Sequence, residues 1–329
     1  MVLTGHDLCI GATPPANGLT NMVISVDDLA AILGALRDQG YRFVGLAEFL
    51  QSRRRGGIAL LTFDDAYRSL ADLGQPLLAR LGIPAVLFAV AGGLLGRGDP
   101  FPHFMHELQD KWTTLPPAVQ AKIDDHPAVK TVVSRATLTS VGELLSRDTA
   151  HEAFVNTLDP AGLADLAAFL ATSAGLRRRT MTLDDMRHLL RSGPFELGAH
   201  SLTHRAFVNL DNETTEREIV ESTAVVADLV GKPAASIGFA YPYGFVTAHA
   251  ASVVARHCAA GFTCHERPLS PVDRSPMLPR VNLDNRTLAI ARPRWPILES
   301  LREETLLYAR TDFGRRVTRP VRALLRAVR

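Results

Sequence analysis

The sequence predicts an α/β fold, an irregular (β/α) barrel of about seven strands with a helical insertion. Two apolar runs, at 58–63 and 83–90, flank a helical stretch. Such a strand–helix–strand unit implies parallel pairing with a right-handed crossover. Further short apolar runs lie near 195–198, 236–241 and 278–283. Strands of a parallel sheet are buried on both faces, so they read as continuous apolar runs of this kind.

The composition supports a large core and argues against some function classes. Of the 329 residues, 47% are hydrophobic and 21% are charged, which is enough for one large domain or two. The net charge of +2 provides no general field for nucleic acid, so no nucleic-acid partner is expected. Cys9, Cys258 and Cys264 show neither paired metal spacing nor a disulfide framework. No pattern indicates an oligomeric state.

The N-terminal elements alternate as an α/β fold requires. A first strand is expected to end just before His6. Ser25 is expected to cap a helix that ends at Gly40. The elements predicted before the first acidic motif are a strand at 2–4, a helix from 26 to 39, a strand at 41–44 and a helix at 46–51.

Residues 97–180 interrupt this alternation and predict a helical insertion at the rim of the barrel. The barrel then resumes with a helix that Thr182 caps. The helices expected in the insertion lie near 104–112, 118–124, 141–145 and 161–171. Those expected after it are the helix that begins at 183 and helices near 214–229 and 247–258.

The first acidic motif is the pair Asp64 and Asp65, which ends the apolar run 58–63. Active sites of α/β folds lie at the carboxyl ends of parallel strands. Neighbouring side chains on a strand point in opposite directions, so one carboxylate can hold a metal while the other remains a base. The alternative interpretation is that both acids cap a helix that begins near Tyr67.

A second short apolar run leads into His200 and His204. If Ser201 begins a helical turn, the two histidines share one face and both imidazoles can bind one ion. Two histidines and one aspartate leave coordination positions open, which suits a catalytic metal site better than a structural one.

Three motifs together resemble the polysaccharide deacetylases, also called NodB-like or carbohydrate esterase family 4 enzymes. They are Thr62-Phe63-Asp64-Asp65, His200-Ser201-Leu202-Thr203-His204 and Ala240-Tyr241-Pro242-Tyr243-Gly244. The resemblance covers about residues 1–290, and it also implies the seven-stranded barrel. Residues 291–329 are then a separate C-terminal helical, Arg-rich tail.

The resemblance implies a role for each motif residue. Asp64 would be the general base, and the backbone N–H of Tyr243 would stabilise the oxyanion. A divalent metal would be held by Asp65, His200 and His204. This ligand set suits Zn²⁺, although Co²⁺ and Ni²⁺ are compatible with it. The residues expected beside the substrate, or just behind the groups that contact it, are Arg280, Pro242 and Tyr241.

The chain departs from the family pattern in two of these motifs. Ala66 stands where most members have glycine, and its methyl group should be tolerated unless φ is positive. Ala240 stands where many members have an arginine that contacts the catalytic aspartate. Arg280 is expected to replace that guanidinium from the next strand.

A third departure concerns the general acid. The family's late Leu-x-His motif is absent, because no histidine follows His265. The acid must therefore come from elsewhere, and His6 is our choice. His103, His106 and His265 are the other candidates.

The expected function is a metal-dependent hydrolase that removes an N-acyl group, most simply acetyl, from an amino sugar. The substrate would be a cell-surface glycan, a lipid-linked sugar or a glycoside precursor. One alternative is an amidohydrolase acting on a non-sugar amide, which the motifs do not distinguish. Another is a catalytically inactive carbohydrate-binding barrel, although a binding module has no use for a free base such as Asp64.

The chain ends give an expectation about location. Residues 1–6 show neither a cationic segment nor a long apolar one, which predicts a cytoplasmic protein. The segment Arg310–Arg329 alternates arginines with apolar residues, and such a segment can bind the anionic inner surface of a membrane. A solvated terminal helix or a disordered tail is the alternative.

Overall fold

The structure is a computed structural model that describes residues 1–12, 22–53, 57–96, 105, 107–109, 111–146, 150–176, 179–265, 267, 269–270 and 273–283. In these residues a parallel sheet has the strand order β10-β1-β5-β6-β7-β8-β9. β4 pairs with the N-terminal end of β5, at Ile58 and Ala59. The strands are β1 (Val2–Gly5), β4 (Arg42–Phe43), β5 (Ile58–Asp64), β6 (Ala85–Ala89), β7 (Phe195–Ala199), β8 (Gly238–Ala240), β9 (Ala260–Phe262) and β10 (Val281–Asn282).

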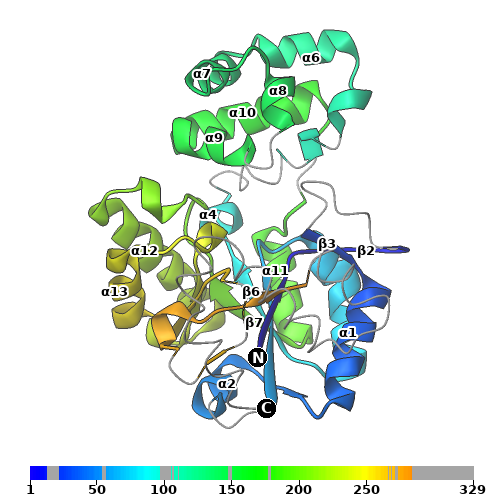
Figure 1. Cartoon of the computed structure of the whole chain (residues 1–329), viewed down its shortest axis with the longest axis vertical. Coiled ribbons are helices and arrows are strands. Elements are labelled where there is room, and N and C mark those ends of the chain that lie inside the picture. The colour runs from blue at the N-terminus through cyan, green and yellow to red at the C-terminus, as the bar shows by residue number, and fades with distance from the viewer. Residues whose placement is uncertain are drawn as a thin grey trace, which may run out of the picture.

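The sheet curls into a half-barrel, which confirms the predicted fold class (Figure 1). A bridge between Phe262 and Leu278 brings the chain just before β10 against the end of β9. The strand expected over 278–283 is only two residues long in the structure. These two residues pair with β1, whereas Leu278 pairs with β9 at the other edge of the sheet.

The register of the central strands places the candidate residues at one edge. β5 and β6 pair from Leu61–Ala85 to Asp64–Phe88, and β6 and β7 pair up to Ala89–Ala199. All seven residues of β5 are buried, as its continuous apolar run predicts. Because these neighbours are parallel, their carboxyl ends meet, and the residues that follow Asp64 and Ala199 come together.

Helices cover the outside of the sheet. Ser25 caps α1 (Val26–Asp38) by accepting from the N–H of Asp28. Thr182 and Asp185 form a capping box at the start of α11 (Leu183–Ser192). The others are α2 (Leu46–Ser52), α3 (Gln75–Leu81), α4 (Ala91–Leu94), α12 (Asn212–Val230) and α13 (Ala248–His257).

One predicted helix differs in form. The sequence favours a continuous helix from the Asp pair to Leu81, but the chain first forms a π-helical segment, η2 (Leu70–Gly74), and then α3. A short two-stranded sheet, β2 (Asp7–Cys9) with β3 (Val23–Ser25), lies beside η2.

The segment between β6 and α11 contains a group of helices with a core of its own, including Ile123, Val132, Phe154 and Leu166. Figure 1 shows this group apart from the helices that surround the sheet. Its members are α6 (Pro117–Asp124), α7 (Pro127–Arg135), α8 (Val141–Leu145), α9 (Ala150–Thr157) and α10 (Pro160–Ser173). The sequence reasoning missed α7 and α9.

Two predictions fall outside the described residues. They are the Arg-rich tail at 291–329 and the histidine pair His103 and His106. Within the described part of the chain, no helix is both long enough and apolar enough to cross a bilayer.

Candidate active site

The acidic motif ends in a turn. Asp64 is the last residue of β5, and the next two residues, Asp65 and Ala66, have φ of 69° and 58°. Alanine at position 66 was expected to be tolerated only if φ is not positive. Because φ of Ala66 is positive, this residue has a left-handed backbone, which costs a non-glycine residue about 1–2 kcal/mol. The returning chain supports the turn: the N–H of Met181 donates to the carbonyl of Ala66 at 2.8 Å.

The histidine motif is also a loop, so the predicted helical turn at Ser201 is wrong. Ser201 and His204 have φ of 63° and 58°, and the N–H of His204 donates to the Ser201 hydroxyl at 2.9 Å. The loop brings both imidazoles to one side without helical spacing. Of the six non-glycine residues with positive φ in the described chain, five lie in the three motif loops. They are Asp65, Ala66, Ser201, His204 and Tyr243. Backbone strain of this kind concentrates at functional sites.

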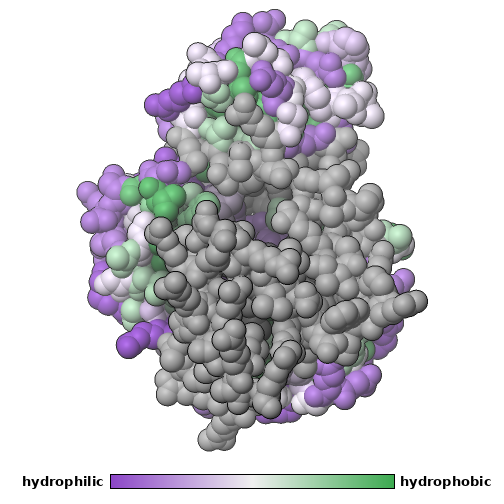
Figure 2. Space-filling model, viewed as in Figure 1, coloured by the Kyte–Doolittle hydropathy of each residue, from purple (hydrophilic) through white to green (hydrophobic). Residues whose placement is uncertain are grey.

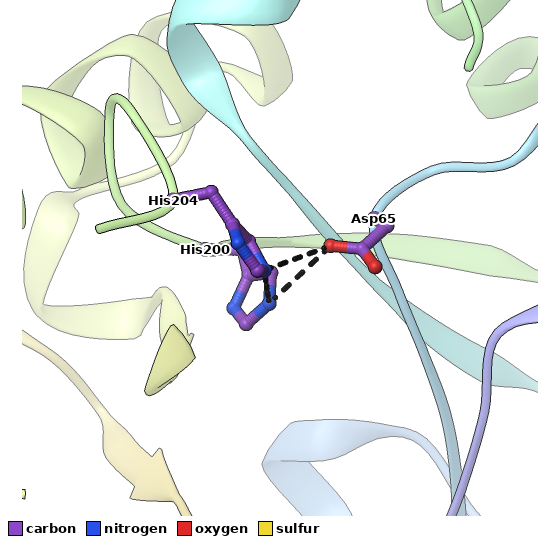
Figure 3. Close-up of side chains that lie close together, drawn as sticks. All are labelled: Asp65, His200 and His204. Carbon is purple, nitrogen blue, oxygen red and sulfur yellow. Dashed lines mark hydrogen bonds and ion pairs between the residues drawn. The ribbon is translucent and has the colours of Figure 1, made fainter. Parts of the chain in front are cut away.

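Asp65, His200 and His204 converge on one point (Figure 3). The Nε2 atoms of the two histidines lie 3.2 Å apart, and Asp65 Oδ1 lies 3.5 Å from that of His200 and 3.2 Å from that of His204. Tetrahedral ligands at about 2.0–2.1 Å from a zinc ion would be about 3.3 Å from one another. The three side chains therefore fit a divalent metal, and all three are buried.

The outer nitrogen of each histidine has a partner that orients the ring. His200 Nδ1 lies 2.8 Å from the carbonyl oxygen of Ala240, so this nitrogen must donate and Nε2 faces the site with its lone pair. His204 Nδ1 lies 3.1 Å from the Tyr243 hydroxyl. Burial lowers the pKa of His200 to about 4, so its ring is neutral at neutral pH, as a ligand must be.

Asp64 is held by Arg280. Two guanidinium nitrogens donate to its two carboxylate oxygens at 2.7 and 2.6 Å, and both side chains are fully or nearly fully buried. Burial alone would raise the pKa of Asp64. The positive charge and hydrogen bonds of Arg280, together with the nearby imidazoles of His200 and His6, outweigh burial and hold this pKa below its usual range. Arg280 directly precedes β10, so its guanidinium reaches Asp64 from the segment between β9 and β10.

The other predicted residues differ in their placement. His6 Nε2 is 4.0 Å from Asp64 Oδ2, and the His6 side chain is 18% exposed. Pro242 is buried beside the site, in the turn that carries Tyr243. Tyr241 lies in the core, and its hydroxyl donates to the carbonyl of Pro276 at 2.7 Å, so it supports packing and not substrate contact. His265 is exposed.

The sequence reasoning missed several residues that hold these loops. It assigned only the backbone of Tyr243, whereas the hydroxyl of this residue contacts a ligand histidine. Outside these loops, it also missed Asp7, which pairs with Arg179 at 2.6 Å and accepts from Ser69. It missed Glu218 on α12, which contacts the histidine loop. These contacts join segments far apart in the chain, so no local pattern marks them.

The surface is hollowed between the helical group and the barrel, as Figure 2 shows, and hydrophilic residues are visible inside this hollow. In the same view of Figure 1, α4 lies at this level of the molecule. The N–H groups of Ala91 and Gly92 in α4 donate to the carbonyls of Ser201 and Leu202, each at 3.0 Å. The histidine loop is therefore on the side of the barrel that faces the helical group.

Residues 146–261 match the polysaccharide deacetylase family. Over these residues, the match confirms the resemblance to polysaccharide deacetylases. The matched segment contains the two histidines and Tyr243, whereas the Asp pair precedes it. Comparison with curated proteins found none that matches the chain.

Solved structures of deacetylases share the fold. The deacetylase PplD of Streptococcus pyogenes, in complex with acetate, matches 87% of this chain and 92% of its own, with 14% identity and a TM-score of 0.55. A de-N-acetylase from Aggregatibacter actinomycetemcomitans matches 91% and 98%, with 13% identity and a TM-score of 0.55. IcaB from Ammonifex degensii matches 86% and 90%, with 19% identity and a TM-score of 0.52.

Proposed function

We propose that this protein is a metal-dependent hydrolase that removes an N-acyl group, most simply acetyl, from an amino sugar. The observation that carries the proposal is the buried triad Asp65, His200 and His204, with mutual distances of 3.2–3.5 Å, next to a second carboxylate on the adjacent residue. The family match and the deacetylase fold support a carbohydrate amide as the substrate.

A divalent cation bound by the triad would polarise the acyl carbonyl and lower the pKa of water in the site. Asp64 would take a proton from the attacking water while the oxygen of this water forms a bond to the acyl carbon. Arg280 contributes by keeping this carboxylate ionised and by fixing both of its oxygens. The backbone N–H of Tyr243 would donate to the oxygen that gains negative charge.

The C–N bond then breaks, and the leaving amine must receive a proton. His6 is the general acid in this proposal, because its Nε2 lies 4.0 Å from Asp64 Oδ2 and its side chain is partly exposed. A proton taken by Asp64 could return to the amine through this pair. The products are acetate and the free amino sugar, and one water is consumed.

We propose the substrate class and the location from the sequence alone. A glycan, a lipid-linked sugar or a glycoside precursor all present the same N-acyl amino sugar. A cytoplasmic enzyme with its Arg-rich tail on the inner membrane surface would meet the last two.

Acetate release from a panel of N-acetylated mono-, oligo- and lipid-linked sugars tests this proposal. The protein should release acetate from at least one class, lose this activity after chelation and regain it with Zn²⁺ or Co²⁺. Acetate release that survives full chelation would contradict the role of the triad. Acetate release from simple non-sugar amides alone would contradict the assignment of an amino sugar as the substrate.

A further inference from the structure

The loop that carries His204 has a costly conformation and needs support. Two of its residues, Ser201 and His204, have positive φ, and strained positions of this kind cost about 1–3 kcal/mol each and persist only where the surroundings impose them. Any relaxation of the loop would move the Nε2 atom of His204, which now lies 3.2 Å from Asp65 Oδ1.

A buried carboxylate supplies part of this support. Glu218, on α12, is 3% exposed. Its Oε2 accepts from the N–H groups of Leu202 and Thr203 at 2.8 and 2.9 Å, and its Oε1 accepts from the Thr203 hydroxyl at 2.6 Å. Hydrogen bonds to an ionised acceptor are about twice as strong as neutral ones. All three donors belong to the two residues between Ser201 and His204.

The opposite side of the same loop is held by α4. The N–H groups of Ala91 and Gly92 donate to the carbonyls of Ser201 and Leu202. The peptide groups of the loop are therefore oriented from both sides, with their N–H groups toward α12 and their carbonyls toward α4. Glu218 is the one charged member of these contacts.

We propose that Glu218 is a positioning residue for the metal site: by binding the peptide groups before His204, it fixes the imidazole where it completes the triad. This inference rests on the proposed metal-dependent function. Glu218 does not touch the triad itself, so its effect would appear in metal affinity and in coordination geometry. Outer groups that orient metal ligands typically change metal affinity by 10–100-fold when they are replaced.

The test compares metal binding by the wild-type protein and Glu218→Gln. The amide keeps the size of the side chain but brings its NH₂ group against backbone donors. Two controls lie on the same helix. Glu221→Gln removes an exposed charge, and Ser222→Ala removes a buried hydroxyl that donates to α12 carbonyls without reaching the loop. Zn²⁺ affinity is measured by competition with a chelator, and the visible spectrum of bound Co²⁺ reports coordination geometry.

We expect Glu218→Gln to bind Zn²⁺ 10–100-fold more weakly than wild type, in the range given above, with an altered Co²⁺ spectrum, whereas both controls keep wild-type values. Urea unfolding of the metal-free proteins separates this effect from general stability. Wild-type affinity in Glu218→Gln would overturn the inference alone, and so would an equal loss in Ser222→Ala. Failure of the wild-type protein to bind either metal would overturn the proposed metal site and, with it, this inference.

Discussion

Replacing Arg280 with methionine is expected to destabilise the protein by about 3–5 kcal/mol, because breaking a buried ion pair leaves the partner charge without compensation. Arg280 is 0% exposed and Asp64 is 2% exposed, and two short hydrogen bonds join them. Methionine can fill the space of the arginine stem against Phe88, over which the guanidinium lies at 5.7 Å. The loss of stability in Arg280→Met therefore measures mainly the effect of the missing charge, and only to a small extent that of a cavity.

Arg267→Met provides the matched control. Arg267 also makes a two-point contact with a buried carboxylate, that of Asp273, but its side chain is 29% exposed. Water can partly replace the lost contact there, so the loss should be near the range of exposed pairs, about 1 kcal/mol or less. The free energies of unfolding are measured in urea. A loss in Arg280→Met that is no larger than in this control would refute the reasoning.

The stability that the Asp64–Arg280 pair contributes should depend on pH in a defined direction. In wild type the pKa of Asp64 is lowered by Arg280, so the pair contributes stability above about pH 4 and loses it as the pH falls through the folded-state pKa. In Arg280→Met burial remains the largest influence on the pKa of Asp64; it raises this pKa and favours the neutral acid. The stability gap between the two proteins should therefore narrow as the pH falls from 7 toward 4. The double variant with Asp64→Asn should be more stable than Arg280→Met alone, since position 64 then carries no buried carboxylate without a partner.

Two other substitutions test the turns that build the site. Ala66→Gly should stabilise the protein by up to about 1 kcal/mol, because it relieves a left-handed alanine, whereas Ala71→Gly within η2 should destabilise it by about 1 kcal/mol; thermal unfolding distinguishes the two signs. Gly92→Ala would drive a methyl group into the Leu202 carbonyl, and it should lower both stability and Zn²⁺ affinity. Gly34→Ala is its control, since a methyl group there meets nothing within 4 Å and should add about 0.5–1 kcal/mol. A stabilising Gly92→Ala would contradict the contact between α4 and the histidine loop.

The fold was predictable from the sequence where local patterns are strong. The continuous apolar run of β5 and the Ser25 and Thr182 caps each predicted an element that the structure contains. Shorter elements were harder to place. α7 and α9 are helices of nine and eight residues in the insertion, and helices this short depend on tertiary packing more than on their own propensity. The predicted domain boundaries remain predictions.

The residues of the site were predictable, but their backbone was not. Motif spacing identified the Asp pair and both histidines, and β5 and β7 bring them to one edge. The helical turn expected after Ser201 is replaced by left-handed positions that only tertiary contacts can impose. Glu218 supplies such contacts from 15–16 residues farther along the chain, and nothing around it in the sequence resembles a site motif.

The most direct test of this account measures bound metal and acetate release together, in the wild-type protein and in Asp64→Asn. We expect both proteins to bind one divalent ion at the triad, with the variant about 10²–10⁴-fold slower because it lacks the general base. Equal rates in the two proteins would contradict the role of Asp64. Failure of both proteins to bind metal after reconstitution would contradict the assignment of Asp65, His200 and His204 as its ligands.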